Sequence, residues 1–247
     1  MHPTSPRLRG TRRKVVIFDV DGTIFRSSLL IELVNVLVER NIFPKQARLE
    51  YEKQYLAWIN RQGPYEDYIK AVVSVFAKYI KGTSHQDVAE IAESVVNHHE
   101  NRTYRYTRDL IAKLKNEGYY LLVISHSPKF VLETFCQKHG FDKCYGTLYA
   151  VDESNKFTGE VSHLQLIYDK AKILKRATEK EDLTLKDSIG VGDTDSDISF
   201  LSLVEKPICF NPNKALFEHA RKNNWLVIVE RKDVIYEIPR MPTDSVK

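Results

Sequence analysis

Two short acidic clusters have the residue types and spacing of a divalent-cation site. Asp19 and Asp21 lie in the turn DVDGT, directly after a β-branched run, and Asp193 and Asp197 lie in the segment GVGDTDSDISFL. Carboxylates placed close together repel one another unless a cation offsets their charge, and hard cations prefer oxygen ligands. Magnesium needs few protein ligands and keeps its waters beside a phosphate. The pattern therefore predicts a site for a hard divalent cation, and magnesium suits it.

Two further polar residues have positions that would complete such a site. Ser125 follows the apolar run 119–124, and Lys170 shares the register of an inward-facing helix side with Ile173 and Leu174. In a parallel sheet, residues that follow the strands converge on one crevice at the carboxyl edge. We therefore expect the acidic clusters, the serine and the lysine to meet there.

The segments around these residues predict the elements that must bring them together. The run 14–18 shows no alternation, which is typical of a parallel strand buried on both faces. From residue 107 onward, strand and helix patterns alternate, which predicts an α/β fold with a doubly wound, parallel, Rossmann-like sheet. Residues 26–106 have apolar positions at helical spacing, so an all-helical cap is expected as an insertion.

Apolar runs, capping residues and glycines give the expected boundaries. Later strands are expected at 119–124, 188–191, 207–210 and 225–229. Helices are expected at 107–118, where Thr107 is the predicted cap, and at 127–140, 164–178, 196–203 and 213–223. The stretch between 140 and 164, which contains Gly146 and Gly159, is expected to be irregular. Within the cap, Ser84 and Asp87 form an acidic variant of a capping box.

The domain prediction combines these elements with the distribution of charge. We predict a discontinuous α/β core of residues 14–25 and 107–235, a helical cap of residues 26–106, a basic disordered arm of residues 1–13 and a loosely ordered tail of residues 236–247. The formal net charge is +4, and five basic residues with no acid in residues 1–14 account for all of it. A solvated terminus explains such an arm better than nucleic-acid binding does.

Composition excludes several classes of protein. Hydrophobic residues make up 43% and charged residues 28%, as in ordinary globular proteins, and no apolar run approaches the ~20 residues of a membrane span. The three cysteines, Cys136, Cys144 and Cys209, show no CxxC spacing, so neither a disulfide framework nor a zinc site is indicated. A cytoplasmic protein without a membrane partner is expected.

The motifs together resemble the haloacid dehalogenase superfamily, specifically subfamily IB, which contains phosphoserine-phosphatase-like hydrolases. FDVDGTIF at 18–25 matches its first motif, DxDGT, and Ser125 in ISHSP matches its second. Lys170 in DKAKIL resembles the third motif, and GVGDTDSDISFL at 190–201 resembles the fourth. Each motif is short, but four in the family order, with a helical segment after the first, make a specific signal.

This resemblance implies roles for the acidic residues. Asp19 would be the nucleophile that attacks phosphorus and forms an aspartyl-phosphate, and Asp21 would be the general acid and then the general base. Asp19, the backbone carbonyl of Asp21 and Asp193 would hold Mg²⁺. Asp197 would orient a metal-bound water or the lysine, and Thr23 would brace the turn.

The resemblance also implies how the substrate phosphate is held. Ser125 and nearby backbone N–H groups, including that of His126, would bind the phosphate oxygens at a helix N-terminus. Lys170 would balance the charge of the aspartate and the phosphate. The implied function is a magnesium-dependent phosphomonoesterase, a phosphatase that cleaves a small phosphorylated metabolite.

The same residues allow other interpretations. A calcium loop starting at Asp193 would need glycine and glutamate where the chain has Ile198 and Val204. A serine hydrolase based on Ser125 lacks the GxSxG turn, and neighbouring residues of a strand project to opposite faces. A phosphomutase or phosphotransferase with the same chemistry, and a noncatalytic phosphate-binding protein of the same fold, remain alternatives. Phosphoserine phosphatases carry a glutamate nine residues after the nucleophile, where this chain has Ser28, so phosphoserine is one candidate substrate only.

Overall fold

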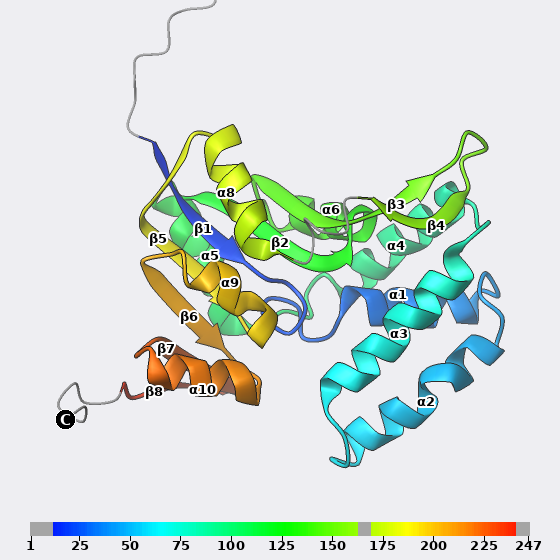
Figure 1. The fold of residues 1–247 in the computed structure, drawn as a ribbon, viewed down its shortest axis with the longest axis horizontal. Coiled ribbons are helices and arrows are strands. Elements are labelled where there is room, and N and C mark those ends of the chain that lie inside the picture. The colour runs from blue at the N-terminus through cyan, green and yellow to red at the C-terminus, as the bar shows by residue number, and fades with distance from the viewer. Residues whose placement is uncertain (1–11, 163–168, 241–247) are drawn as a thin grey trace, which may run out of the picture.

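One eight-stranded sheet forms the centre of the molecule (Figure 1). The computed structural model describes residues 12–162 and 169–240. The order of the strands across the sheet is β4-β3-β2-β1-β5-β6-β7-β8, and the pairs are parallel except β3 with β4 and β7 with β8. The chain leaves β1 toward β2 and β3 on one side and later returns to β5 and β6 on the other. Such a reversal of strand order creates a crevice at the carboxyl edge beside β1.

The strands have the following bounds: β1 (Arg13–Phe18), β2 (Tyr120–Pro128), β3 (Lys143–Val151), β4 (Phe157–Ser162), β5 (Leu183–Gly192), β6 (Lys206–Phe210), β7 (Leu226–Arg231) and β8 (Val234–Ile238). The helices that cover the sheet are α5 (Arg105–Asn116), α6 (Lys129–Lys138), α8 (Lys170–Lys180), α9 (Ile198–Leu201) and α10 (Lys214–Lys222). The 3-10 turn η1 (Asp195–Asp197) leads into α9. The predicted α/β class with a doubly wound sheet is confirmed.

Burial on both faces explains why β1 has no polar alternation. Val16 and Phe18 belong to the core on the α5 and α6 side of the sheet. Val15 and Ile17 belong to the core on the α8, α9 and α10 side. All four side chains have no exposed surface, so each face of the strand contributes to a separate hydrophobic layer.

Four helices are inserted between β1 and α5: α1 (Leu29–Glu39), α2 (Gln46–Ile59), α3 (Tyr65–Ile80) and α4 (His85–His99). Their apolar positions recur at helical spacing, as Tyr68, Val72 and Phe76 do in α3, and these side chains are buried. The Ser84 hydroxyl accepts a hydrogen bond from the backbone N–H of Asp87, as the predicted cap requires. The helical nature of this insertion is confirmed, while its division from the core as a separate domain stays a prediction.

The two connections between the insertion and the sheet lie side by side. Phe25 and Thr103 form an isolated antiparallel bridge, and the backbone N–H of Arg26 donates to the carbonyl of Arg102. The Thr107 hydroxyl donates to the carbonyl of Thr23 (3.0 Å). Thr107 was predicted as the cap of α5, which is wrong, because the helix begins two residues earlier and the side chain ties the helix to the loop after β1.

One other prediction of local structure is wrong. The stretch expected to be irregular forms the antiparallel hairpin β3–β4, in which the Asp152 carboxylate stabilises the turn by accepting from the backbone N–H groups of Ser154 and Lys156. The first residues of the predicted tail, 236–238, belong to β8, which pairs with β7 from Val234 to Ile238, while most of the tail lies outside the described residues.

The predicted helix at 164–178 and the predicted arm fall partly outside the described residues. The described part of that helix is α8, which starts at Lys170, and residues 1–11 and 241–247 are likewise not described. Arg13, at the end of the predicted arm, belongs to β1 and pairs with Asp142. No helix in the described part of the chain has the length and apolar character needed to cross a membrane.

Candidate active site

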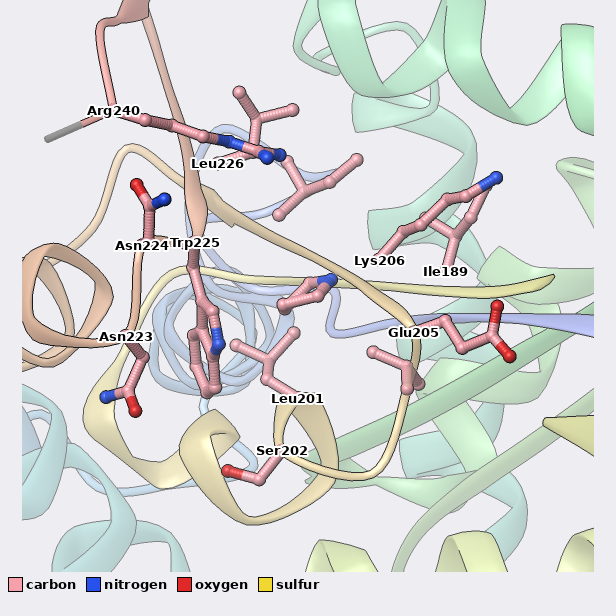
Figure 2. A pocket seen from close by; sticks show the side chains of 13 residues that line it. Ile189, Leu201, Ser202, Glu205, Lys206, Asn223, Asn224, Trp225, Leu226 and Arg240 are labelled. Carbon is pink, nitrogen blue, oxygen red and sulfur yellow. The ribbon is translucent and has the colours of Figure 1, made fainter. Parts of the chain in front are cut away.

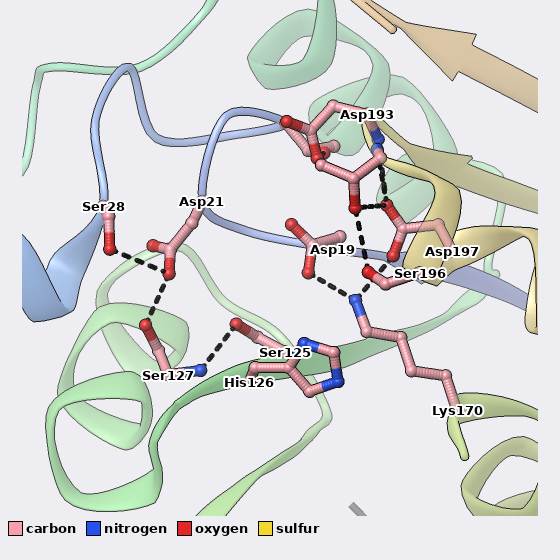
Figure 3. A network of polar contacts seen from close by, with 12 residues as sticks. Asp19, Asp21, Ser28, Ser125, His126, Ser127, Lys170, Asp193, Ser196 and Asp197 are labelled. Atoms are coloured by element: carbon pink, nitrogen blue, oxygen red, sulfur yellow. Dashed lines mark hydrogen bonds and ion pairs between the residues drawn. The ribbon is translucent and has the colours of Figure 1, made fainter. Parts of the chain in front are cut away.

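The predicted site residues from three strands and one helix meet at the carboxyl edge of the sheet (Figure 3). Asp19 directly follows β1, and Asp193 directly follows the neighbouring strand β5. Ser125 lies near the end of β2, which pairs with β1 on its other side. Lys170 is the first residue of α8 and is 1% exposed, so it is a buried charge and not part of a solvated helix face.

Three carboxylates lie around the buried ammonium group of Lys170. Oxygen atoms of Asp19, Asp193 and Asp197 all lie within 4.8 Å of one another. Lys170 Nζ donates to Asp19 Oδ1 (2.7 Å) and to Asp197 Oδ1 (2.5 Å). Three negative charges therefore face one positive charge in a region shielded from water, which leaves a deficit of positive charge.

Asp197 is fully buried, and both of its oxygens already have partners in the protein. Oδ1 accepts from Lys170, and Oδ2 accepts from the backbone N–H groups of Asp193 (3.0 Å) and Thr194 (3.1 Å). These contacts fix the loop after β5 and the lysine at the same time. Asp197 is thus suited to position its neighbours, as expected, and has less capacity left for a direct metal contact than Asp19 or Asp193 has.

The turn after β1 also positions Asp193. The hydroxyl of the buried Thr23 donates to Asp193 Oδ1 (3.1 Å). Gly22 has a φ of +82°, and a Cβ at this position would lie 2.2 Å from Asp193 Oδ2. Glycine is therefore required here both for the backbone conformation and for the close approach of the carboxylate.

The electrostatics of the cluster favour a bound cation. Burial raises the pKa of Asp19 to about 7, although Lys170 acts to lower it, and the negative charges of Asp197 and Asp21 raise it further. Burial, with the charge of Asp19, also raises the pKa of Asp193. Burial acts to lower the pKa of Lys170, but the two aspartates outweigh it and raise that pKa above its ordinary value.

A magnesium ion fits the donor set of this cluster. Asp19 Oδ2 and the carboxylate of Asp193 are hard oxygen donors, and each is held by a second residue, Lys170 or Thr23. The excess negative charge would be offset by a divalent cation, which also prefers such oxygen ligands. The predicted ligand set therefore remains a proposal that the geometry supports.

The carboxylate of Asp21 points away from Lys170, toward the start of α1 (Figure 3). Its Oδ1 accepts from the backbone N–H of Leu29 (2.9 Å), and its Oδ2 accepts from the hydroxyls of Ser127 (2.5 Å) and Ser28 (3.3 Å). Burial raises the pKa of Asp21 even though these three donors lower it. Asp21 is thus held on the side of the site that faces the inserted helices.

Ser127 and Ser28 are site residues that the sequence reasoning did not assign. The sequence places Ser127 at the start of a predicted helix and Ser28 at the position of a family glutamate, and neither position indicates a role in the site. Both are nearly fully buried, at 3% and 1% exposure. Buried hydroxyls next to an acidic motif are a usable signal, because such groups need a partner, but the sequence does not show which strand or helix supplies it.

Ser125 and the next residue, His126, differ in exposure to solvent. Ser125 is 3% exposed and its hydroxyl accepts from the backbone N–H of Ser127 (3.1 Å). His126 is exposed, and its carbonyl accepts from the Thr147 hydroxyl (2.6 Å). The chain then enters α6 at Lys129. Ser125 and His126 thus differ in burial, as expected for neighbours in a strand.

A further pocket lies elsewhere in the molecule (Figure 2). It has a volume of 630 Å³ and opens where β6 and β7 begin, beside Lys206 and Trp225, at the amino edge of the sheet. None of the predicted site residues lines it. The buried aspartates at the carboxyl edge, whose pKa values are raised, are therefore the better candidate for the active site.

A family model of haloacid dehalogenase-like hydrolases matches residues 16–202. This span includes both acidic clusters, the serine, the lysine and the inserted helices. The chain belongs to the haloacid dehalogenase-like hydrolase family. The family assignment made from the four motifs is thereby confirmed.

Relatives of known name cover most of the chain at low identity. A histidinol-phosphatase from Neisseria meningitidis is 23% identical over 87% of this chain and 98% of its own length. A phosphoserine phosphatase from Methanocaldococcus jannaschii is 22% identical over 90% of this chain and 95% of its own length. The "Inhibition of morphological differentiation protein" of Streptomyces azureus is 23% identical over 87% of this chain and 78% of its own.

Solved structures confirm the fold over a similar length. A protein of unknown function from Bordetella pertussis superposes with a TM-score of 0.70 at 19% identity, covering 88% of this chain and 98% of the other. A phospho-aspartyl intermediate analogue of phosphoserine phosphatase superposes with a TM-score of 0.60 at 22% identity, covering 90% and 96%. The family and these relatives confirm the predicted enzyme class, a phosphatase of the haloacid dehalogenase-like hydrolases.

Proposed function

We propose that this hydrolase is a magnesium-dependent phosphomonoesterase that transfers the phosphoryl group of a small metabolite to Asp19 and then to water. The observation that carries the proposal is the buried arrangement of Asp19, Asp193 and Asp197 around the ammonium group of Lys170. It combines a carboxylate nucleophile, a cation site and a fixed positive charge. Phosphoryl transfer depends mainly on positioning and on stabilisation of charge, which these groups supply.

In the first step, an Asp19 oxygen forms a bond to phosphorus while the bond from phosphorus to the ester oxygen breaks. Lys170 contacts Asp19 Oδ1 and so holds the carboxylate in place for the attack. Ser125, with backbone N–H groups at the start of α6, would bind phosphate oxygens. Magnesium, held by Asp19, Asp193 and the carbonyl of Asp21, would reduce the repulsion between the carboxylate and the phosphate.

Asp21 would donate a proton to the departing alcohol and then accept one from the attacking water. Its raised pKa favours the protonated form that the first step needs. The three hydrogen bonds from Leu29, Ser28 and Ser127 would stabilise the carboxylate that remains after the proton has left. In the second step, water attacks phosphorus, the bond to Asp19 breaks, and inorganic phosphate is released.

The relatives support this proposal without defining the substrate. One solved relative is named as a phospho-aspartyl intermediate analogue, and two curated relatives are named as phosphatases of different small metabolites. Ser28 occupies the position at which phosphoserine phosphatases have a glutamate. Its hydroxyl donates a hydrogen bond to Asp21, and it carries no charge that could bind a substrate ammonium group. A phosphotransferase would share the first step, and the acceptor of the second step separates the two functions.

The proposal is tested with a panel of phosphate esters of small alcohols and sugars, with released phosphate measured in magnesium and in chelator. We expect magnesium-dependent phosphate release that Asp19→Asn abolishes. Asp195→Asn is the matched control, because Asp195 belongs to the same acidic segment but lies outside the cluster of three carboxylates. Release that persists in Asp19→Asn would refute the proposal. Transfer of the phosphoryl group to a second sugar hydroxyl, with no free phosphate, would favour the phosphotransferase.

A further inference from the structure

A groove of 340 Å³ runs between α1 and α2 in the inserted helices. From α1 it is lined by Glu32, Asn35 and Glu39, and from α2 by Tyr51, Glu52 and Tyr55; His98 and His99 of α4 also line it. Residues three, four or seven positions apart lie on the same face of a helix, so each helix presents one continuous stripe to the groove. The Tyr51 hydroxyl donates to Asn35 Oδ1 (3.0 Å), which fixes the middle of one stripe against the middle of the other.

Aromatic rings form one wall of this groove. Tyr68 of α3 lines it and lies 6.0 Å from the Tyr51 ring and 5.3 Å from the Tyr55 ring, between ring centroids. Trp58 stacks on Tyr68 from behind (5.8 Å). The faces of aromatic rings attract organic cations, and ammonium groups are bound in proteins by such aromatic walls.

The charges of the groove have the complementary sign. Three carboxylates, those of Glu32, Glu39 and Glu52, line it together with the single guanidinium group of Arg48. Glu32 already pairs with Arg102 (2.8 Å), which lies outside the groove, and lies 3.4 Å from the ring of His99, which lines it. Over residues 12–162 and 169–240, neither Glu39 nor Glu52 has an ion-pair partner, so their charges are available to a ligand.

One lining residue of the groove, Glu32, connects it to the acidic turn after β1. Glu32 accepts from the Ser27 hydroxyl (2.7 Å), and the next residue, Ser28, donates to Asp21. Tyr65 continues the aromatic wall from Tyr68 (6.1 Å) toward the active site. Partial burial and the charges of Asp21 and then Asp193 raise the pKa of Tyr65.

The length of the groove sets the size of a suitable leaving group. Leu29, which contacts Asp21, and Asn35, which faces Tyr51, are six residues apart on α1, or about 9 Å at 1.5 Å per residue. Glu52 is the residue after Tyr51, so its carboxylate lies at about this distance along the groove. A cation would therefore need to be several bonds away from the ester oxygen, further than in an amino acid such as serine.

We propose that the groove between α1 and α2 binds the leaving group of the substrate, and that this leaving group is an extended alcohol with a cationic nitrogen at its far end. The aromatic wall of Tyr51, Tyr55 and Tyr68 would contact the chain and the nitrogen, and Glu52 would offset its charge. This inference rests on the proposed phosphatase function, since it names the substrate class of the same site.

The test compares amines with methyl isosteres of the same length. Hydrolysis of 2-aminoethyl, 4-aminobutyl and 6-aminohexyl phosphate is measured against propyl, pentyl and heptyl phosphate, as kcat/KM. We expect a preference for the amine that increases with length and reaches about tenfold for the longest pair, because an aromatic wall and a partly exposed carboxylate each contribute modestly. An equal rate for the longest pair, or a preference for heptyl phosphate, would overturn the inference.

Glu52→Gln removes the charge and keeps the shape of the side chain. We expect it to reduce the preference for 6-aminohexyl over heptyl phosphate about threefold, through KM and with kcat unchanged. The matched control is Glu93→Gln, which makes the same charge change at an exposed position of α4 outside the groove and is expected to leave the preference intact. An equal effect of both variants would refute a specific role of Glu52 and the inference with it.

Binding of the free alcohols separates this inference from the proposed catalysis. Binding of 6-aminohexan-1-ol and of heptan-1-ol to the full-length Asp19→Asn protein is measured by calorimetry or by NMR. Tighter binding of the amino alcohol, weakened by Glu52→Gln, would support the groove even if no ester in the panel is hydrolysed. Equal or weaker binding of the amino alcohol would contradict the groove, whereas phosphatase activity that survives Asp19→Asn would contradict only the proposed function.

Discussion

Replacing Lys170 with methionine should destabilise the protein strongly, because the side chain is buried between two carboxylates. Its Nζ lies 2.7 Å from Asp19 Oδ1 and 2.5 Å from Asp197 Oδ1. Each contact is worth ~6 kcal/mol at an effective dielectric constant of about 20, before the cost of removing the ions from water. That cost offsets much of the attraction, and loss of one partner of a buried pair typically lowers the free energy of unfolding by ~3–5 kcal/mol.

The assay is urea denaturation in chelator at neutral pH, so that no cation replaces the lost ammonium group. Lys172→Met is the matched control, because Lys172 lies on the same helix with its side chain 67% exposed and, among the described residues, pairs with Asp169 alone. A surface pair of this kind contributes ~0–1 kcal/mol. A loss for Lys170→Met below ~1 kcal/mol, or a loss equal to that of the control, would refute the view that the lysine holds the carboxylate cluster together.

Two further predictions concern the cation and the turn that shapes its site. The pKa of Asp19 is raised to about 7 from an ordinary value of 3.8, so protons compete with the cation for this carboxylate below pH 7. Magnesium affinity measured by calorimetry should therefore rise with pH and level off above pH 7. A magnesium affinity that does not change with pH would contradict this prediction. Gly22→Ala should lose stability and also magnesium affinity, because its Cβ would lie 2.2 Å from Asp193 Oδ2. Gly82→Ala, with a φ of +79° and no atom within 4 Å of its Cβ, should lose only ~1–2 kcal/mol of stability. Unchanged magnesium affinity in Gly22→Ala would argue against the proposed site.

The central sheet and the cluster of carboxylates could be predicted because their signals are local. The uninterrupted apolar run before Asp19 indicates a strand with two buried faces, and the carboxyl ends of parallel strands share one edge. The helix register of Lys170 was enough to place it inward. Each of these inferences needs only the neighbouring residues and the rule for parallel sheets.

The features that escaped prediction depend on contacts between distant segments. The β3–β4 hairpin was missed because its two glycines suggested an irregular stretch, while its pairing and the turn at Asp152 are visible only in three dimensions. Thr107 has the residue type of a helix cap but bonds to Thr23, 84 positions away. Ser127 contacts Asp21 across 106 positions, so its role in the site could not be inferred from spacing.

The most direct test of the account is to identify the residue that carries the phosphoryl group. Borohydride reduces an acyl phosphate to an alcohol, so treatment during turnover should convert Asp19 into homoserine, which peptide mass spectrometry detects. We expect this conversion at Asp19 alone, and only when a substrate ester and magnesium are both present. Steady release of phosphate with Asp19 unmodified, or modification of Asp21 or Asp193 in its place, would contradict the central claim.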